Sequence, residues 1–239
     1  MTAMTPNLPA APVKAVLADR NISNETLHIL KKLGIQVLLT IKLPEITDST
    51  ATHPDMQFAP IGYKKALVCG SVYTNYRAIL PDYRLIPVYG IQSPYPNDSL
   101  LNITVIRTQC FATKYQQDKL RLDGFDYITV KQGYTKCNIC ILNENALITS
   151  DRSISSAAAQ RGIRTYLLPD KEIELAGYNH GFWGGTCGLI DKDKLFFNGD
   201  ITRLGCYVNL MKILEKEKVE PIYHTASGLC DIGSIIPLY

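Results

Sequence analysis

The fold is decided by the segment of residues 14–39, whose sequence is KAVLADRNISNETLHILKKLGIQVLL. Its first six residues predict a short apolar strand, and residues 35–39 predict a second one. Between them, Ser23 is typical of a helix N-cap and Gly34 is typical of a helix end. Three leucines recur at helical spacing and mark one apolar face of this helix: Leu27, Leu30 and Leu33. The segment therefore predicts a strand–helix–strand unit.

Four further stretches of the chain show a similar order of predicted elements, each with strands around a polar turn rich in Gly, Pro or Asn. The five polar turns are centred on Asp55, Asn97, Gln132, His180 and Cys230. Dividing 239 residues by five gives about 48 residues per unit, so the repeats account for nearly the whole chain. Each unit has one apolar face that it cannot cover alone, so the units should close on each other.

We therefore expect an α/β fold in which five βαβ-type units form a ring, as a single domain of residues 1–239. A flat row of units would leave two exposed strand edges, whereas a closed ring joins the first unit to the last. The polar turns should gather near one end of the ring axis. The expected helices and strands after residue 39 are residues 66–69, 102–107, 137–142, 146–149, 155–161, 165–168, 188–197, 207–217 and 221–223.

Composition excludes several classes of protein. The chain is 46% apolar and 20% charged, and its net charge of +3 comes without clusters of Lys and Arg. We therefore expect neither a nucleic-acid partner nor a membrane partner. Apolar runs such as residues 139–142 are far too short to span a bilayer, and the stretch from Met1 shows no secretory signal. The seven cysteines, an odd number, predict buried reduced thiols in a cytoplasmic protein.

Metal and cofactor binding receive little support from the sequence. Cys137 and Cys140 form a Cys-x-x-Cys pair that resembles half of a zinc site, but the chain has no second such pair. In an extended strand the two sulfurs would point to opposite faces. Residues 181–185, GFWGG, do not have the spacing of a nucleotide-binding loop. We expect no cofactor and no metal; a metal protein using Cys137, Cys140 and histidines remains a weaker third hypothesis.

A ring of five such units resembles the pentein fold of the guanidino-group-modifying enzymes, which include arginine deiminases, dimethylarginine hydrolases, agmatine deiminases and amidinotransferases. Three stretches carry the resemblance: HPDM at residues 53–56, HGF at 180–182 and GLC at 228–230. The phrases HPDMQ, GFWGGTCG and DIGSIIPLY also look like one branch of this superfamily. The resemblance implies a five-bladed α/β propeller of ββαβ-like repeats with pseudo-five-fold symmetry.

The resemblance also implies a hydrolase or amidinotransferase-like enzyme that acts, without a cofactor, on a small amidino or guanidino compound. Cys230 would be the nucleophile, with its pKa lowered by His180, which would also serve as general acid and base. Asp55 would bind the cationic group through charge-assisted hydrogen bonds. Asp98 and Asp231 are further candidates for binding that cation.

The chain departs from the family pattern at two places. Lys131-Gln132-Gly133 stands where the family has an acidic residue before paired glycines, and Phe182 stands where it has a second acid. These departures favour an alternative function, a catalytically inactive pentein that serves as a binding or scaffold module. Cys230, His180 and Asp55 each also admit an ordinary structural role, and His53 is expected to be structural or on the surface. Substrate identity and oligomeric state stay open.

Overall fold

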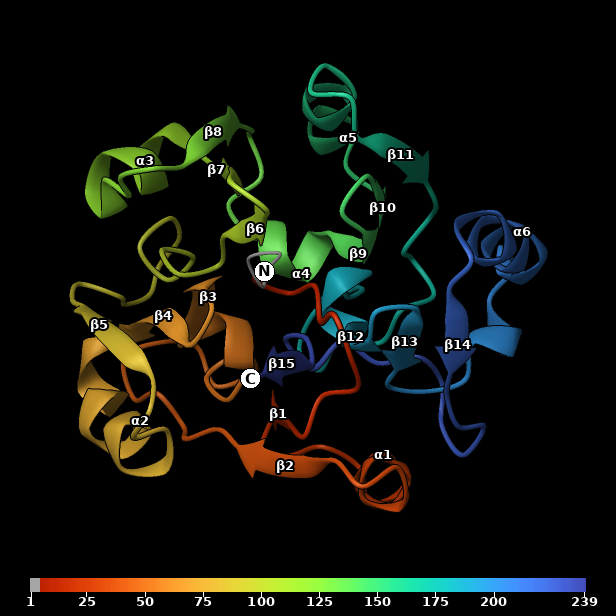
Figure 1. Ribbon diagram of the computed structural model, residues 1–239, viewed down its shortest axis with the longest axis horizontal. Helices are drawn as coiled ribbons and strands as arrows, with labels where there is room; N and C mark the ends of the chain where they lie inside the picture. Colours follow the sequence, from red (N-terminus) through yellow and green to blue (C-terminus); the bar gives the residue numbers. More distant parts are fainter. Residues whose placement is uncertain (1–4) are drawn as a thin grey trace.

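The computed structural model describes residues 5–239; residues 1–4, which belong to the predicted domain and to the stretch inspected for a signal, lie outside this range. Within it, five three-stranded sheets are arranged around a common centre, with the longer helix of each unit on the outside (Figure 1). The expected α/β ring of five repeats is confirmed. That residues 1–239 act as a single domain stays a prediction.

Each unit consists of an antiparallel strand pair, a helix and a third strand that pairs in parallel with the second. Four units are continuous in sequence. One contains β3 (Phe58–Gly62), β4 (Lys65–Cys69), α2 (Tyr73–Ile79) and β5 (Arg84–Val88), and the next contains β6 (Thr104–Ile106), β7 (Gln109–Ala112), α3 (Lys114–Leu120) and β8 (Asp126–Thr129). They are followed by the unit of β9 (Cys140–Asn143), β10 (Ala146–Thr149), α5 (Arg152–Ala159) and β11 (Arg164–Leu167), and by the unit of β12 (Cys187–Asp191), β13 (Lys194–Phe197), α6 (Tyr207–Glu217) and β14 (Glu220–Ile222).

The fifth unit joins the two ends of the chain. It contains β1 (Ala15–Ala18), α1 (Asn24–Lys32) and β2 (Gln36–Leu39), and it is completed by β15 (Ile236–Leu238) from the C-terminus. Strand β15 pairs antiparallel with β1, with Ala15 opposite Leu238. This pairing closes the ring, and it takes the place of the hairpin that begins each of the other units.

Several local predictions from the sequence are confirmed. Ser23 caps α1 by accepting a hydrogen bond from the Thr26 N–H, and Gly34 adopts the left-handed backbone with φ of 77° after the helix. Helix α6 has the bounds expected for residues 207–217. Helix α5 begins earlier than expected because the Asp151 side chain caps it by accepting from the Ile154 N–H.

The strand expected over residues 137–142 is wrong in its first half. Residues Thr135–Asn138 form a one-turn helix, α4, and strand β9 begins only at Cys140. The cause is Asn102, whose Oδ1 accepts hydrogen bonds from the N–H groups of Lys136 and Cys137 at 2.8 and 3.1 Å. This partner lies more than thirty positions earlier in the chain, so the apolar pattern of residues 137–142 gave no sign of the helical turn.

The core is built mainly between neighbouring sheets. Trp183 is fully buried in the largest cluster of apolar side chains, and its Nε1–H donates to the Leu168 carbonyl at 3.3 Å. Helices α2 and α3, which the sequence analysis did not predict, cover sheets whose inner faces belong to a second cluster. Within residues 5–239, no helix combines the length and the apolar character needed to cross a membrane.

Candidate functional site

The candidate site is built from the connections between units. Each connection runs from the outer strand of one unit to the inner strand of the next, and the inner strands β3, β6, β9, β12 and β15 surround the centre of the ring (Figure 1). The residues that meet there lie two or three positions before these strands: Asp55, Asn102, Cys137, Gly185 and Ser234. All five connections therefore contribute to one central cluster.

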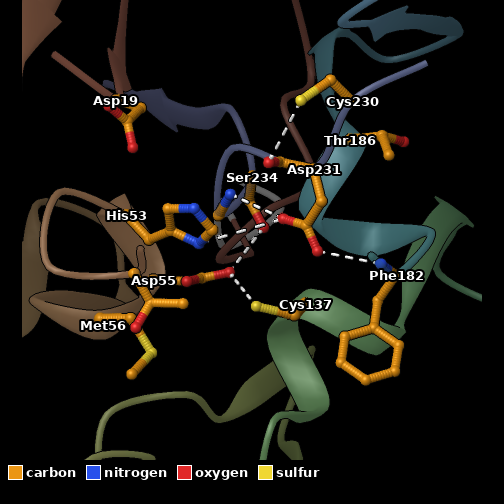
Figure 2. A network of polar contacts seen from close by, with 12 residues as sticks. Asp19, His53, Asp55, Met56, Cys137, Phe182, Thr186, Cys230, Asp231 and Ser234 are labelled. Atoms are coloured by element: carbon orange, nitrogen blue, oxygen red, sulfur yellow. Dashed lines mark hydrogen bonds and ion pairs between the residues drawn. The ribbon is translucent and has the colours of Figure 1, made fainter. Parts of the chain in front are cut away.

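Asp55 is the residue around which the cluster is organised. It is fully buried on a 3₁₀ turn, η1 (Pro54–Met56), and its N–H donates to the Gly233 carbonyl at 3.2 Å. Its Oδ2 accepts hydrogen bonds from the Cys137 thiol at 2.9 Å and from the Ser234 hydroxyl at 3.1 Å (Figure 2). Its Oδ1 is buried and has no hydrogen-bond partner. One face of this carboxylate can therefore accept a hydrogen bond from a ligand.

Asp231 supplies a second buried carboxylate. The backbone N–H groups of Phe182 and Gly233 donate to its two oxygens, each at 2.9 Å, and His53 Nδ1 lies 4.0 Å from Oδ1 (Figure 2). Burial raises the pKa of Asp231 to about 6, and the charge of Asp55 contributes to the rise while His53 opposes it. Among residues 5–239, no Lys or Arg forms an ion pair with Asp55 or Asp231.

Gly185 makes room for the Asp231 carboxylate. A Cβ atom at this position would lie 2.0 Å from Asp231 Oδ1, which is far inside van der Waals contact. Gly185 lies on the 3₁₀ turn η3 (Gly184–Thr186), just before the inner strand β12, and its carbonyl accepts from the Ser234 N–H at 2.8 Å. The absence of a side chain here is therefore a requirement of the site.

Cys137 is a buried neutral thiol. It donates to Asp55 and accepts a hydrogen bond from Asn102 Nδ2 at 3.2 Å. Burial raises its pKa well above the ordinary value, and the charges of Asp55 and Asp231 add to this effect. Cys140 lies in strand β9 and, within residues 5–239, is not grouped with Cys137 among side chains that could hold a metal ion.

Cys230 is half-buried, and it is the one cysteine of the seven that is not fully buried. Asn198 holds it in place: the Cys230 N–H donates to the Asn198 carbonyl, and Asn198 Nδ2 donates to the Cys230 carbonyl, both at 3.1 Å. Burial raises the pKa of Cys230 to about 11, and the charges of three acids add to the rise: Asp231, Glu174 and Asp19. The lowered pKa that the sequence analysis expected is not found.

His180 lies in the connection that leads to β12. Its Nδ1 is 2.9 Å from the Gly181 carbonyl and 3.7 Å from Asp170 Oδ1, and its ring meets that of Phe182 edge-on. No hydrogen bond or ion pair within residues 5–239 joins His180 to Cys230. The imidazole that lies within the cluster is that of His53, which is buried rather than on the surface.

Asp98 belongs to a neighbouring group of residues. Its Oδ2 accepts a hydrogen bond from the Tyr134 hydroxyl at 3.0 Å, its Oδ1 has no partner, and burial raises its pKa. Tyr134 directly precedes α4, which carries Cys137. Two of the expected turn centres make hydrogen bonds in this region: Asn97 Oδ1 accepts from the Tyr115 hydroxyl, and Gln132 Oε1 accepts from the Tyr134 N–H. That all five turn centres gather at one end stays a prediction.

The sequence points to Asp55 and Asp231 as candidates for binding a cation, and to Cys137 only as a weaker candidate for a metal ligand. It predicts a structural or surface role for His53 and gives no role to Ser234. The repeat itself supplies a signal for Cys137 and Ser234, because a polar side chain stands two or three positions before four of the five inner strands. Three of the expected turn centres, Asn97, Gln132 and His180, lie seven or eight positions before their inner strands, whereas Asp55, Asn102 and Cys137 lie two or three positions before theirs.

The fold is shared with solved structures of an amidinotransferase, an agmatine deiminase and a DDAH. Inosamine-phosphate amidinotransferase from Streptomyces griseus has a TM-score of 0.63 at 13% identity, over 99% of this chain and 97% of its own. The agmatine deiminase of C. jejuni has a TM-score of 0.57 at 10% identity, over 99% and 96%. The DDAH from Pseudomonas aeruginosa, solved as a cysteine-to-serine variant with citrulline, has a TM-score of 0.56 at 10% identity, over 90% and 92%.

At these identities the likeness is one of fold, and the fold is the expected pentein fold of the guanidino-group-modifying enzymes. A search of curated protein sequences finds no significant match. The model of a family described as a family of unknown function, DUF6873, matches residues 17–236, and the chain belongs to this family.

Proposed function

We propose that the protein binds a small amidino or guanidino compound at the central cluster and modifies it, as a hydrolase or an amidinotransferase-like enzyme. The observation that carries the proposal is the pair of buried carboxylates, Asp55 and Asp231, which has no Lys or Arg partner within residues 5–239. Buried negative charge is costly unless it is paired. A planar cation with several N–H groups would pair with it and reach the free Oδ1 of Asp55.

Cys230 is the proposed nucleophile. It is the most exposed thiol, and its Sγ lies 3.6 Å from the Asp231 carbonyl oxygen (Figure 2). The charge of Asp231 contributes to its high pKa, so a cation bound at Asp231 would cancel that contribution and lower the pKa. The thiolate would then form mainly when the substrate is in place, close to the carbon that it attacks.

The proposed reaction has two steps. The thiolate adds to the amidino carbon, and the C–N bond to the leaving amine breaks as an imidazolium gives that amine a proton. Water, or an acceptor amine in a transferase, then attacks the same carbon, gives a proton to the imidazole and releases the thiolate. His180 is the proposed proton carrier, and His53 is the other candidate because it lies 4.0 Å from Asp231.

The second candidate function is a binding module without chemistry. It is favoured by the high pKa of Cys230 and by the contacts of His180, which go to Gly181, Asp170 and Phe182. In this case the acidic cluster would hold a cationic ligand and release it unchanged. We further propose a cytoplasmic location, which the seven unpaired cysteines support.

A pair of matched probes tests the enzyme proposal. Chloroacetamidine is a cationic alkylating agent, and chloroacetamide is its neutral counterpart of similar shape. We expect chloroacetamidine to label Cys230 faster, as read by mass spectrometry of the intact protein and its peptides, and we expect Asp55→Asn to remove that preference. Equal rates for the two probes would contradict a cation site beside Cys230, and labelling of another cysteine would contradict its role as nucleophile.

Catalytic turnover separates the two candidate functions. A panel of guanidino compounds incubated with the protein should release an amine or ammonia, and the release should stop in Cys230→Ser. Binding of the same compounds without any product, in a protein whose Cys230 also shows no preference for chloroacetamidine, would support the binding module.

A further inference from the structure

We infer that His53, Cys137 and Asp231 form a binding site for one divalent transition-metal ion of the zinc type. One ligand atom from each residue lies within 4.8 Å of the other two, and all three residues are buried. They come from three different connections, those that lead into β3, β9 and β15. This inference goes beyond the proposed function and does not depend on it.

An unpartnered nitrogen points to a ligand at this place. His53 Nδ1 is buried and has no hydrogen-bond partner, and it lies 4.0 Å from Asp231 Oδ1 (Figure 2). That separation is too long for a hydrogen bond. Zinc binds nitrogen and oxygen at about 2.0–2.2 Å and sulfur at about 2.3 Å, so tetrahedral ligand atoms lie roughly 3.3–3.7 Å apart. A small closing movement would bring the three atoms to this spacing.

The kinds of donor atom select the metal. An imidazole nitrogen, a thiolate and a carboxylate suit Zn²⁺ or Co²⁺, whereas Mg²⁺ and Ca²⁺ require a shell of oxygen atoms. Three protein ligands leave a fourth position for water or another small molecule. The site therefore has the donor number of an open zinc site rather than that of a closed structural one.

Neighbouring residues already hold each ligand in position. Asn102 Nδ2 donates to Cys137 Sγ at 3.2 Å, which would stabilise a thiolate, and two backbone N–H groups fix the Asp231 carboxylate. His53 packs closely on Gly233, where a Cβ atom would lie 2.2 Å from His53 Cβ. This close approach fixes the His53 Cα and Cβ atoms beside Gly233, which itself donates to Asp231.

Metal binding requires that the Cys137 thiol lose its proton. The S–H currently donates to Asp55 Oδ2, so Asp55 is the base next to it. As the metal–sulfur bond forms, the proton passes to Asp55 or to solvent, and no electron transfer is involved. The ion would share Asp231 with the proposed amidino site, so metal and cationic substrate should compete for the protein.

Cobalt titration of the metal-free protein tests the site. We expect one Co²⁺ per chain, a thiolate-to-Co²⁺ charge-transfer band in the near ultraviolet, and displacement of the cobalt by Zn²⁺. Cys137→Ser and His53→Gln should each abolish the band and weaken Zn²⁺ binding by more than the roughly 10–100-fold that loss of a supporting residue costs. Cys140→Ala, three positions from Cys137, should leave both unchanged, and circular dichroism confirms folding of each variant.

Two outcomes would overturn the inference. One is the absence of the band in folded wild-type protein at a cobalt excess. The other is a band that persists in Cys137→Ser and disappears in Cys230→Ser, which would place the metal on the half-buried thiol. Because the chloroacetamidine experiment can be run with a chelator present, failure of the metal site and failure of the proposed enzyme function are separate results.

Discussion

The Cys137 thiol donates a 2.9 Å hydrogen bond to Asp55 Oδ2, although 82 positions separate the two residues in the chain (Figure 2). Asp55 precedes β3, the inner strand of one unit, and Cys137 precedes β9, the inner strand of the next unit but one. The unit that contains β6 lies between these two units in the chain, so the hydrogen bond must cross the centre of the ring. Ser234, which precedes the strand that closes the ring, donates to the same oxygen.

The first prediction concerns the charge of Asp55. Asp55→Asn keeps the shape of the side chain but removes its charge, so it should weaken binding of a cationic ligand by roughly 1.5–3 kcal/mol, the range for a charged hydrogen bond. Isothermal titration calorimetry with a confirmed amidino ligand measures this loss. The control is Asp48→Asn, an exposed acid paired with Lys42, which should leave affinity unchanged. Equal affinity of Asp55→Asn and wild type would mean that the cation binds elsewhere.

The second prediction concerns the reactivity of Cys230. Iodoacetamide should label it faster than the six buried thiols because access limits them. A pKa of about 11 leaves roughly one Cys230 thiol in ten thousand ionised at pH 7, so the rate should rise about ten-fold per pH unit above neutrality. A bound amidine should shift this profile to lower pH.

The role of His180 is tested in the same labelling experiment. If its imidazolium stabilises the Cys230 thiolate, His180→Ala should slow labelling in the presence of a bound amidine. His53→Ala is the matched comparison, since His53 is the imidazole beside Asp231. A rate that is unchanged in His180→Ala and reduced in His53→Ala would transfer the proton-carrier role to His53. Labelling of Cys230 no faster than that of Cys69 would argue against covalent catalysis.

The third prediction concerns stability and pH. Burial raises the pKa of Asp231 from 3.8 to about 6, so the folded protein holds this proton more tightly than the unfolded chain. The stabilisation is fully present below about pH 4 and is lost as pH rises through about 6. The difference corresponds to about 3 kcal/mol at most. Urea unfolding of wild type and Asp231→Asn across this window should show wild type losing stability relative to the variant; parallel curves would contradict the assignment.

The fourth prediction concerns the space beside Asp231. Gly185→Ala would place a Cβ atom 2.0 Å from Asp231 Oδ1, so the carboxylate must move. We expect a lower thermal midpoint and loss of the preference of Cys230 for chloroacetamidine. Gly62→Ala is the control, because its Cβ would meet only the Lys65 side chain, at 3.4 Å or more. Similar behaviour of the two variants would show that Asp231 does not need its present position.

The sequence by itself determined the repeat and much of its local structure. Ser23 caps the start of helix α1 with its side chain, and Gly34 follows its end with a left-handed backbone. Helix α6 covers the expected residues 207–217. These features depend on residues that are only a few positions apart, so the local sequence is enough to predict them. The same local rules predicted five units. Because each unit exposes an apolar face that it cannot cover alone, the five units pack against one another in a closed ring.

Only the tertiary structure decided which polar residues meet. The hydrogen bonds of the central cluster join residues 82 positions apart for Asp55 and Cys137 and 179 positions apart for Asp55 and Ser234. The helical turn at Cys137 likewise depends on Asn102, 35 positions earlier. Such contacts exist because ring closure brings the ends of distant connections to one point. No propensity or periodicity of the local sequence encodes that proximity.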